Sequence, residues 1–366
     1  LALGQLAALA RDQFGGPLVA ITGSSGKTGV KDMVAAILRH CGPVLATRGN
    51  LNNHIGVPLT LAELRAEHRF AVLEMGASGP GEIAYLCRLA RPGVALVNNV
   101  MPAHVAGFGS LAGVAAAKGE IYRALGATGV AVFNVDEPWV ASWRQQLSCD
   151  NTLTYSLSRD DVDFSVRDLR LDSDGCPQFT LVTPAGAIAV QLRLCGRHQV
   201  GNAVAAAACA SAAGAGLGHI AAGLAAIESG AGRMQVKAGI AGARVIDDSY
   251  NANPGSVKAA IDALAGFAGY RLLVLGDMGE LGPEAAALHA EIGAYAAACQ
   301  IDECWAVGPL SAGAVTAFGD PGRHFADNDT LGAALTGHLA ATAQRPLTVL
   351  IKGSRSARME EVVAVI

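Results

Sequence analysis

A short segment near the start of the chain combines the residue types that bind phosphate groups. The apolar run 18–22 leads into a turn and a helix start that read Gly23, Ser24, Ser25, Gly26, Lys27 and Thr28. The glycines leave backbone N–H groups open to phosphate oxygens, and the helix N-terminus adds partial positive charge. The lysine supplies a point charge and the threonine a hydroxyl for Mg²⁺. The segment predicts a nucleotide phosphate loop, although its glycines are closer together than in the general pattern.

Three further side chains could act beside this loop. Glu74 ends the apolar run 70–73, so its carboxylate is expected at the C-terminal edge of a sheet, where a cation bound to phosphate could be held. His104 follows the next expected strand, and Lys118 lies in a helical run with few charges. Taken singly, each has a plainer interpretation: a solvated strand end, a structural histidine and a lysine whose stem lies along the surface.

Composition and charge bound the class of protein. With 366 residues the chain is long enough for two or three domains, and 51% hydrophobic but only 5% aromatic residues are typical of an α/β protein with closely packed helices. The formal net charge of -4 argues against nucleic acid or an anionic membrane as the main partner, because both are negatively charged. We therefore expect neither as a partner.

The cysteines and the apolar segments point to a cellular compartment. Eight cysteines show no Cys-x-x-Cys spacing and lie mostly in apolar runs, which is typical of reduced thiols in a core. No segment reaches the roughly 18 uninterrupted apolar residues of a membrane helix, and the first residues lack a signal-peptide pattern. We expect a cytoplasmic enzyme.

Two regions with alternating strand and helix patterns predict two α/β domains. The first, residues 1–231, should hold a mostly parallel sheet, with strands at 18–22, 70–74, 94–98 and 130–134. Period-2 runs between 152 and 194 predict a small antiparallel portion of the same domain, and helices follow at 201–213 and 218–227. The glycine-rich segment 214–218 joins these helices and is interpreted as a turn, not a dinucleotide fingerprint.

A hinge is expected at 229–232, where glycine and serine interrupt the pattern. The second domain, residues 232–366, should be a Rossmann-like open α/β sheet. Its expected strands are 243–247, 272–275, 303–307 and 348–351.

Considered jointly, these motifs resemble those of the Mur ligase family. The loop 22–28 is similar to that family's shortened phosphate loop, and Glu74, His104 and Lys118 match its magnesium positions. The resemblance implies ATP and two Mg²⁺ ions, with the lysine carbamylated so that it presents oxygen ligands. It also assigns nucleotide contacts to Asn202, Arg233 and Asp248. Gln199 stands where the family has asparagine, and no role is carried over to it.

Segments at both ends of the chain resemble the members that join D-Ala-D-Ala to a UDP-N-acetylmuramoyl tripeptide. They are residues 49–58, 247–256, 276–282 and 352–360. The resemblance implies these two small-molecule substrates, with substrate contacts expected from Asn50, Asn52, Asn53, Asn251, Lys352, Ser354 and Arg355. The Asp-Asn-Pro-Arg motif of the diamino-acid-adding members is absent from the sequence.

The implied activity is ATP-dependent amide ligation by a monomer, with Lys27, Lys118 and Arg233 acting in catalysis. Family members bind the uridine diphosphate through a domain that precedes the phosphate loop by far more than the 22 residues present here. We therefore expect this chain to comprise only the central and C-terminal domains and to ligate poorly alone. Two alternatives remain: another ligase of the superfamily, such as folylpolyglutamate synthase, or a non-catalytic nucleotide-binding module.

Overall fold

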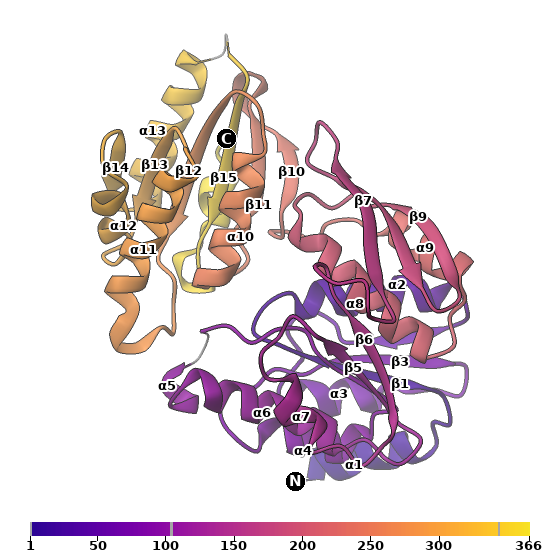
Figure 1. Ribbon diagram of the computed structural model, residues 1–366. Coiled ribbons are helices and arrows are strands. Elements are labelled where there is room, and N and C mark those ends of the chain that lie inside the picture. The colour runs from indigo at the N-terminus through magenta and orange to yellow at the C-terminus, as the bar shows by residue number, and fades with distance from the viewer. Residues whose placement is uncertain (1, 103–104, 343–344) are drawn as a thin grey trace.

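The computed structural model describes residues 2–102, 105–342 and 345–366. The chain forms two α/β domains that lie side by side, and the part of the chain up to α9 makes the larger one (Figure 1). Each domain is built on a six-stranded sheet. The expected fold class, a mostly parallel domain with a small antiparallel portion followed by an open α/β domain, is confirmed.

The first sheet has the strand order β2-β3-β1-β4-β5-β6, and all its neighbouring strands are parallel. Its strands are β1 (Leu18–Thr22), β2 (Val44–Ala46), β3 (Phe70–Glu74), β4 (Val94–Val97), β5 (Val130–Asn134) and β6 (Asn151–Tyr155). Every residue of β1, β3 and β4 is buried, because helices cover both faces of the sheet. The C-terminal ends of these central strands therefore meet at one edge.

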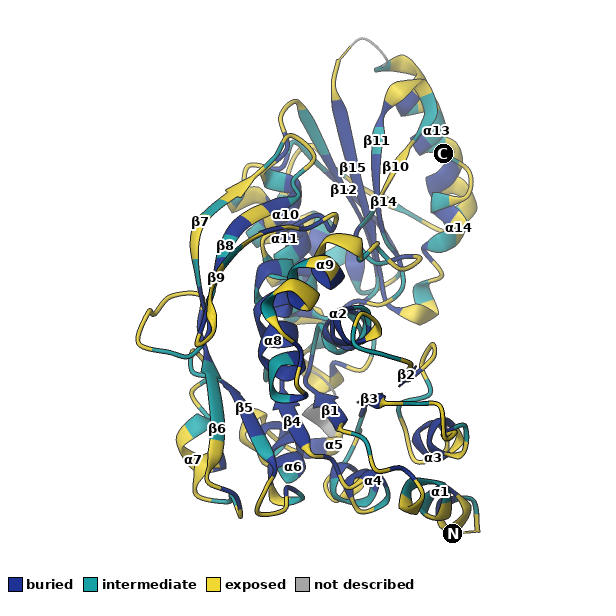
Figure 2. Cartoon of the chain, turned by 90° about the vertical axis from the view of Figure 1, so that its right-hand side faces the viewer, coloured by how far each residue is buried: buried dark blue, intermediate teal, exposed yellow. Residues whose placement is uncertain are grey.

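Two hydrophobic cores fill the space between this sheet and its helices (Figure 2). One face is covered by α2 (Lys27–Arg39), α8 (His198–Ala212) and α9 (Leu217–Ala226). The other carries α1 (Ala2–Asp12), α3 (Gly56–Ala62), α4 (Glu82–Ala90), α6 (Leu111–Arg123) and α7 (Val140–Arg144), and the short α5 (Val105–Phe108) packs on α6. The helix–turn–helix expected around Gly214 is confirmed, with φ +100° at that glycine.

The antiparallel portion is smaller than the sequence predicts. It is a separate three-stranded sheet of β7 (Ser165–Leu171), β8 (Pro177–Thr183) and β9 (Gly186–Gln191). The expectation that residues from 152 onward belong to it was wrong, because β6 pairs in parallel with β5 and extends the main sheet. A half-exposed edge strand shows the same polar–apolar alternation in either direction.

The second domain has the strand order β10-β11-β15-β12-β13-β14, in which only the β10–β11 pair is antiparallel. The strands are β10 (Gln235–Ala238), β11 (Arg244–Asp248), β12 (Tyr270–Gly276), β13 (Glu303–Val307), β14 (Gly322–Phe325) and β15 (Leu347–Lys352). Helices α10 (Pro254–Ala265), α11 (Ala285–Ala298) and α12 (Ser311–Phe318) pack on one face, and α13 (Asn328–Ala341) and α14 (Glu360–Val363) on the other. Within the described ranges, no helix is long and apolar enough to cross a membrane.

Candidate active site at the domain junction

The phosphate loop joins β1 to α2 in a conformation that requires glycine. Gly26 precedes the first helical residue with φ +75°, in the left-handed region that glycine adopts without strain. A Cβ atom there would lie 2.6 Å from Oδ1 of Asn202 and 2.7 Å from Nδ2 of Asn98. The glycine is therefore needed both for the backbone turn and for the close approach of two amide side chains.

Two asparagines that the sequence analysis did not identify hold this loop. Asn99 accepts a hydrogen bond from the Ser25 N–H (2.8 Å) and donates one to the Ser25 carbonyl (3.0 Å). Asn98 donates to the same carbonyl (3.0 Å) and to Oδ1 of Asn202 (3.2 Å). Both follow β4, so the neighbouring strand fixes the loop. In the sequence, Asn98 and Asn99 are only two amide residues at the end of a strand. This pattern is common, so it could not identify them as residues that hold the loop.

Replacing Asn99 with alanine should weaken nucleotide binding by about 30-fold, because two hydrogen bonds that shape the loop are lost and each contributes roughly 1 kcal/mol. Isothermal calorimetry with an ATP analogue and Mg²⁺ measures this change. Asn151→Ala, an exposed position at the start of β6, is the matched control. Equal affinities for the two variants would show that the loop holds its shape without Asn99.

Two lysines converge on one backbone oxygen of the loop. The ammonium groups of Lys27 and Lys118 both donate to the Gly23 carbonyl, at 2.9 and 3.0 Å, although the residues come from α2 and α6. Burial and, to a smaller extent, the charge of Lys27 lower the pKa of Lys118 to about 7. Burial also lowers the pKa of Lys27, while the nearby Glu74 carboxylate opposes that shift. Two lysine amines with lowered pKa values therefore meet at one carbonyl of the loop.

On the other side of the loop lie oxygen ligands suited to a hard cation. The Thr28 hydroxyl donates to Oε2 of Glu74 (2.7 Å), and the Asn52 amide donates to Oε1 (2.7 Å). Glu74 is only 3% exposed, and its backbone N–H donates to the Thr47 hydroxyl. Mg²⁺ is commonly held by one or two carboxylates or hydroxyls together with phosphate oxygens and water. This donor pair fits one such ion next to a bound nucleotide.

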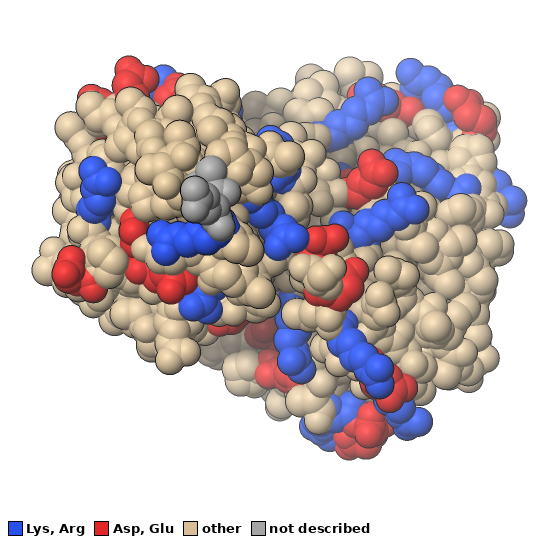
Figure 3. Space-filling view, turned by 90° about the horizontal axis from the view of Figure 1, so that it is seen from above, with Lys and Arg blue, Asp and Glu red and all other residues tan. Residues whose placement is uncertain are grey.

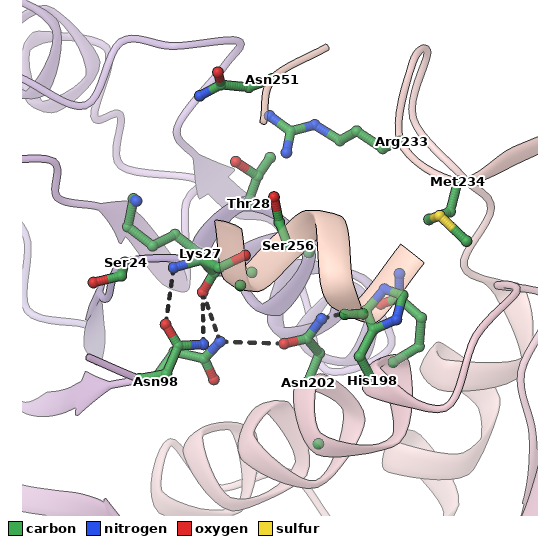
Figure 4. A pocket seen from close by; sticks show the side chains of 18 of the residues that line it. Ser24, Lys27, Thr28, Asn98, His198, Asn202, Arg233, Met234, Asn251 and Ser256 are labelled. Carbon is green, nitrogen blue, oxygen red and sulfur yellow. Dashed lines mark hydrogen bonds between the residues drawn. The ribbon is translucent and has the colours of Figure 1, made fainter. Parts of the chain in front are cut away.

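The second domain contributes a cation and a carboxylate to the same region. The Arg233 guanidinium lies 4.0 Å from the centroid of the Tyr250 ring and points toward Thr28 and Asn251 (Figure 4). Asp248 ends β11, accepts a hydrogen bond from the Met234 N–H (3.1 Å) and forms an ion pair with the buried Lys352. The sequence analysis did not identify Tyr250 as the platform for the arginine.

Two cavities meet at the phosphate loop. The larger, about 450 Å³, lies between the domains and is lined by the loop, the end of β5, the start of α8 and the segments around Arg233 and Asp248. The smaller, about 200 Å³, lies between the loop and the segment that follows β3, with Lys118 in its wall. Ser24 and Lys27 line both. The loop is thus the partition between them.

The structure brings most of the expected site residues together. Asn50, Asn202, Arg233, Asp248, Asn251 and Lys352 line the larger cavity, and Asn52, Asn53 and Lys118 line the smaller. Ser354 and Arg355 are not among the described residues that line either one. Ser354 is buried and its hydroxyl donates to the Asp277 carbonyl (2.6 Å), whereas Arg355 is exposed and pairs with Glu360. His104 lies outside the described residues.

The surface carries charges of both signs. On the face seen in Figure 3, Lys and Arg side chains alternate with Asp and Glu rather than gathering in one basic area. Nucleic acid requires a basic stripe or patch. This face offers no such patch.

The fold and the cleft define a two-domain α/β nucleotide-binding protein in which a phosphate loop of one domain faces an arginine of the other. Comparison with protein families agrees: the model of the Mur ligase middle domain matches residues 21–210, and that of the Mur ligase, glutamate ligase domain matches residues 232–355. The chain belongs to the Mur ligase family.

Two relatives within the family are named UDP-N-acetylmuramoyl-tripeptide--D-alanyl-D-alanine ligase. The Escherichia coli protein is 48% identical over 363 residues, and the Haemophilus influenzae protein is 42% identical over 369 residues. Each alignment covers 99% of this chain and 79% of the relative.

Solved structures agree. A crystal structure of MurF from Acinetobacter baumannii superposes with a TM-score of 0.94 at 36% identity, covering 99% of this chain and 79% of that one. The structure of MurF ligase from Thermotoga maritima in complex with ADP superposes with a TM-score of 0.88 at 28% identity. The alignment covers 100% of this chain and 83% of that one.

Proposed function

We propose that this chain acts as an ATP-dependent ligase of peptidoglycan synthesis that joins D-Ala-D-Ala to a UDP-N-acetylmuramoyl tripeptide. Family membership and the names of its relatives support this activity. The observation that carries the mechanism is the meeting of two cavities at Lys27. A nucleotide in the larger cavity and an acceptor carboxylate in the smaller would face each other across that lysine.

The reaction then has two steps. A carboxylate oxygen of the tripeptide attacks the γ-phosphorus of ATP, and ADP leaves. The amine of D-Ala-D-Ala next attacks the acyl carbon of the acyl phosphate and forms the C–N bond. The C–O bond to the phosphate breaks, phosphate leaves with the electron pair, and the amine nitrogen gives up a proton. Lys27 and Arg233 would offset the charge of the transferring phosphoryl group, and such fixed charges are the main source of rate in phosphoryl transfer. Asn202 and Asp248 would hold the nucleoside from opposite domains.

Magnesium would be held at two positions. Thr28 and Glu74 would hold one ion, and the close approach of their hydroxyl and carboxylate oxygens supports this. The second position, assigned by family resemblance to His104 and a carbamylated Lys118, needs the carbamate because an ammonium would repel the ion. Bound Mg²⁺ would neutralise phosphate charge so that one anion can approach another.

Nucleotide binding should draw the two domains together, because Arg233 and Asp248 belong to the second domain and the loop to the first. Small-angle X-ray scattering with an ATP analogue and Mg²⁺ should show a smaller radius of gyration than without it. Arg233→Ala should reduce this compaction. Arg323→Ala, which removes a guanidinium stacked 4.5 Å from the Trp305 ring in the same domain, is the control. Identical scattering at saturating ligand would argue against closure.

The choice of the amine substrate tests the function itself. We expect ATP-dependent phosphate release with the tripeptide and D-Ala-D-Ala, but not when D-Ala-D-Ala is replaced by diaminopimelate or glutamate. Turnover with glutamate on a folate acceptor would instead support a folylpolyglutamate synthase. Nucleotide-dependent compaction without phosphate release, in the presence of both substrates, would support a binding module.

Three further properties belong to this proposal. We place the division between the functional domains at 231/232, which falls between the segments matched by the two family models. We propose that the protein acts in the cytoplasm, where ATP is available, and its eight cysteines are all free thiols. We also propose a monomer, because both cavities are lined by one chain.

A further inference from the structure

Met101 lies between the phosphate loop and the second domain. It is the second residue after Asn99, and its backbone exchanges two hydrogen bonds with the Ser24 side chain. The Ser24 hydroxyl donates to the Met101 carbonyl (3.0 Å) and accepts from the Met101 N–H (2.9 Å). The Ser24 N–H also donates to the Asn99 carbonyl (3.0 Å). The two segments are thus tied together through one serine.

The preceding residue has a further anchor on the other side. The Val100 N–H donates to Oε2 of Glu137, which follows β5 (3.3 Å). The backbone of Met101 is therefore held by the phosphate loop on one side and, through Val100, by the β5 end on the other.

The Met101 side chain meets the second domain at Gly255. This glycine is the second residue of α10, after the helix-starting Pro254 and the Asn253 capping box. Its backbone does not adopt a positive φ, so conformation does not require glycine there. A Cβ at Gly255 would lie 2.4 Å from Sδ of Met101, so the methionine side chain would have to shift to admit it. Both residues line the larger cavity.

We propose that Met101 is a positioning residue that couples the approach of the second domain to the geometry of the phosphate loop. Gly255 belongs to the second domain, so the start of α10 meets the sulfur where the two domains approach, beside a segment bonded to Ser24. Ser24 is one of the two residues that separate the cavities. This inference rests on the proposed ATP-dependent ligation, because the contact would depend on the two domains closing when nucleotide binds.

The test combines substitutions on the two sides of the contact. Gly255→Ala inserts a methyl group where the sulfur lies, and it should lower kcat of ligation by about tenfold, while the KM for ATP changes less than about threefold. It should also reduce the nucleotide-dependent compaction seen by small-angle scattering. The melting temperature should change by only a few degrees, because the preference of alanine over glycine in a helix offsets part of the cost of the added methyl group. Gly337→Ala in α13, where a Cβ meets nothing within 4 Å, is the matched control.

The second variant removes the sulfur. Met101→Ala should itself lower kcat, and adding Gly255→Ala to it should cost nothing more, because the clash is gone. Met101→Leu should keep most of the activity. Multiplying effects in the double variant, or a Gly255→Ala protein that ligates and compacts as the unsubstituted one does, would overturn the inference. If the unsubstituted protein does not ligate D-Ala-D-Ala, the proposed function fails, and scattering with the ATP analogue still tests the contact.

Discussion

Lys27→Ala should lower the rate of ligation by at least about 100-fold, the scale for losing one preorganised electrostatic contact to a transition state. The Lys27 ammonium lies 2.9 Å from the Gly23 carbonyl oxygen, and its half-buried side chain lines both cavities. No other cation in the described part of the chain lines both, so the loss would not be covered by a neighbour. Phosphate release at saturating substrates measures the change.

Two variants make this result interpretable. Lys258→Ala removes a lysine of α10 that pairs with Glu291 on the surface, and it should leave turnover unchanged. Lys27→Arg keeps the charge but not the compact ammonium, and it should recover only part of the rate. Ligation by Lys27→Ala within a few-fold of the unsubstituted protein would remove the loop from the catalytic account.

Lys118→Ala should also abolish most activity, by at least about 100-fold, for a different reason. Lys118 is 3% exposed, and its ammonium shares the Gly23 carbonyl with Lys27. As an ammonium it would repel Mg²⁺, whereas the carbamate implied by the family resemblance would supply oxygen ligands. Short carboxylic acids such as acetate should partly restore the alanine variant by occupying the vacated volume with a carboxylate.

A second buried lysine provides the control for this rescue. Lys31 lies in α2, is 5% exposed and pairs with Asp32. Any activity lost in Lys31→Ala should not return with acetate. The carbamate itself should appear in the carbon-13 spectrum of the unsubstituted protein supplied with labelled bicarbonate, and it should be missing in Lys118→Ala. Full activity of Lys118→Ala would refute the assignment.

The strands that the sequence predicts best lie in the interior of the two six-stranded sheets. β1 and β3 coincide with their expected bounds, because a continuous apolar run stops abruptly at a glycine or a charged residue. β2, β10 and β14 were missed. Each has three or four residues and lies at an edge of its sheet, where partial exposure relaxes the need for apolar side chains.

The site divides in a similar way. The glycines, Lys27 and Glu74 could be identified because their chemistry and their position after a strand reinforce each other. Asn99, Tyr250 and Met101 could not, because their roles depend on which segments pack together rather than on their own type. Ser354 is the opposite case. It lies in a segment similar to a ligase motif, but it is buried against the Asp277 backbone and lines neither cavity.

The partition formed by Ser24 and Lys27 has a consequence for inhibitor design. A molecule with a nucleoside mimic at one end and an acceptor mimic at the other could occupy both cavities through a short anionic linker that passes Lys27. Once one end is bound, the other is held at an effective concentration on the millimolar scale. Two weak fragments joined in this way could gain about 10²- to 10⁴-fold in avidity without any new contact, provided that the linker matches the thickness of the loop.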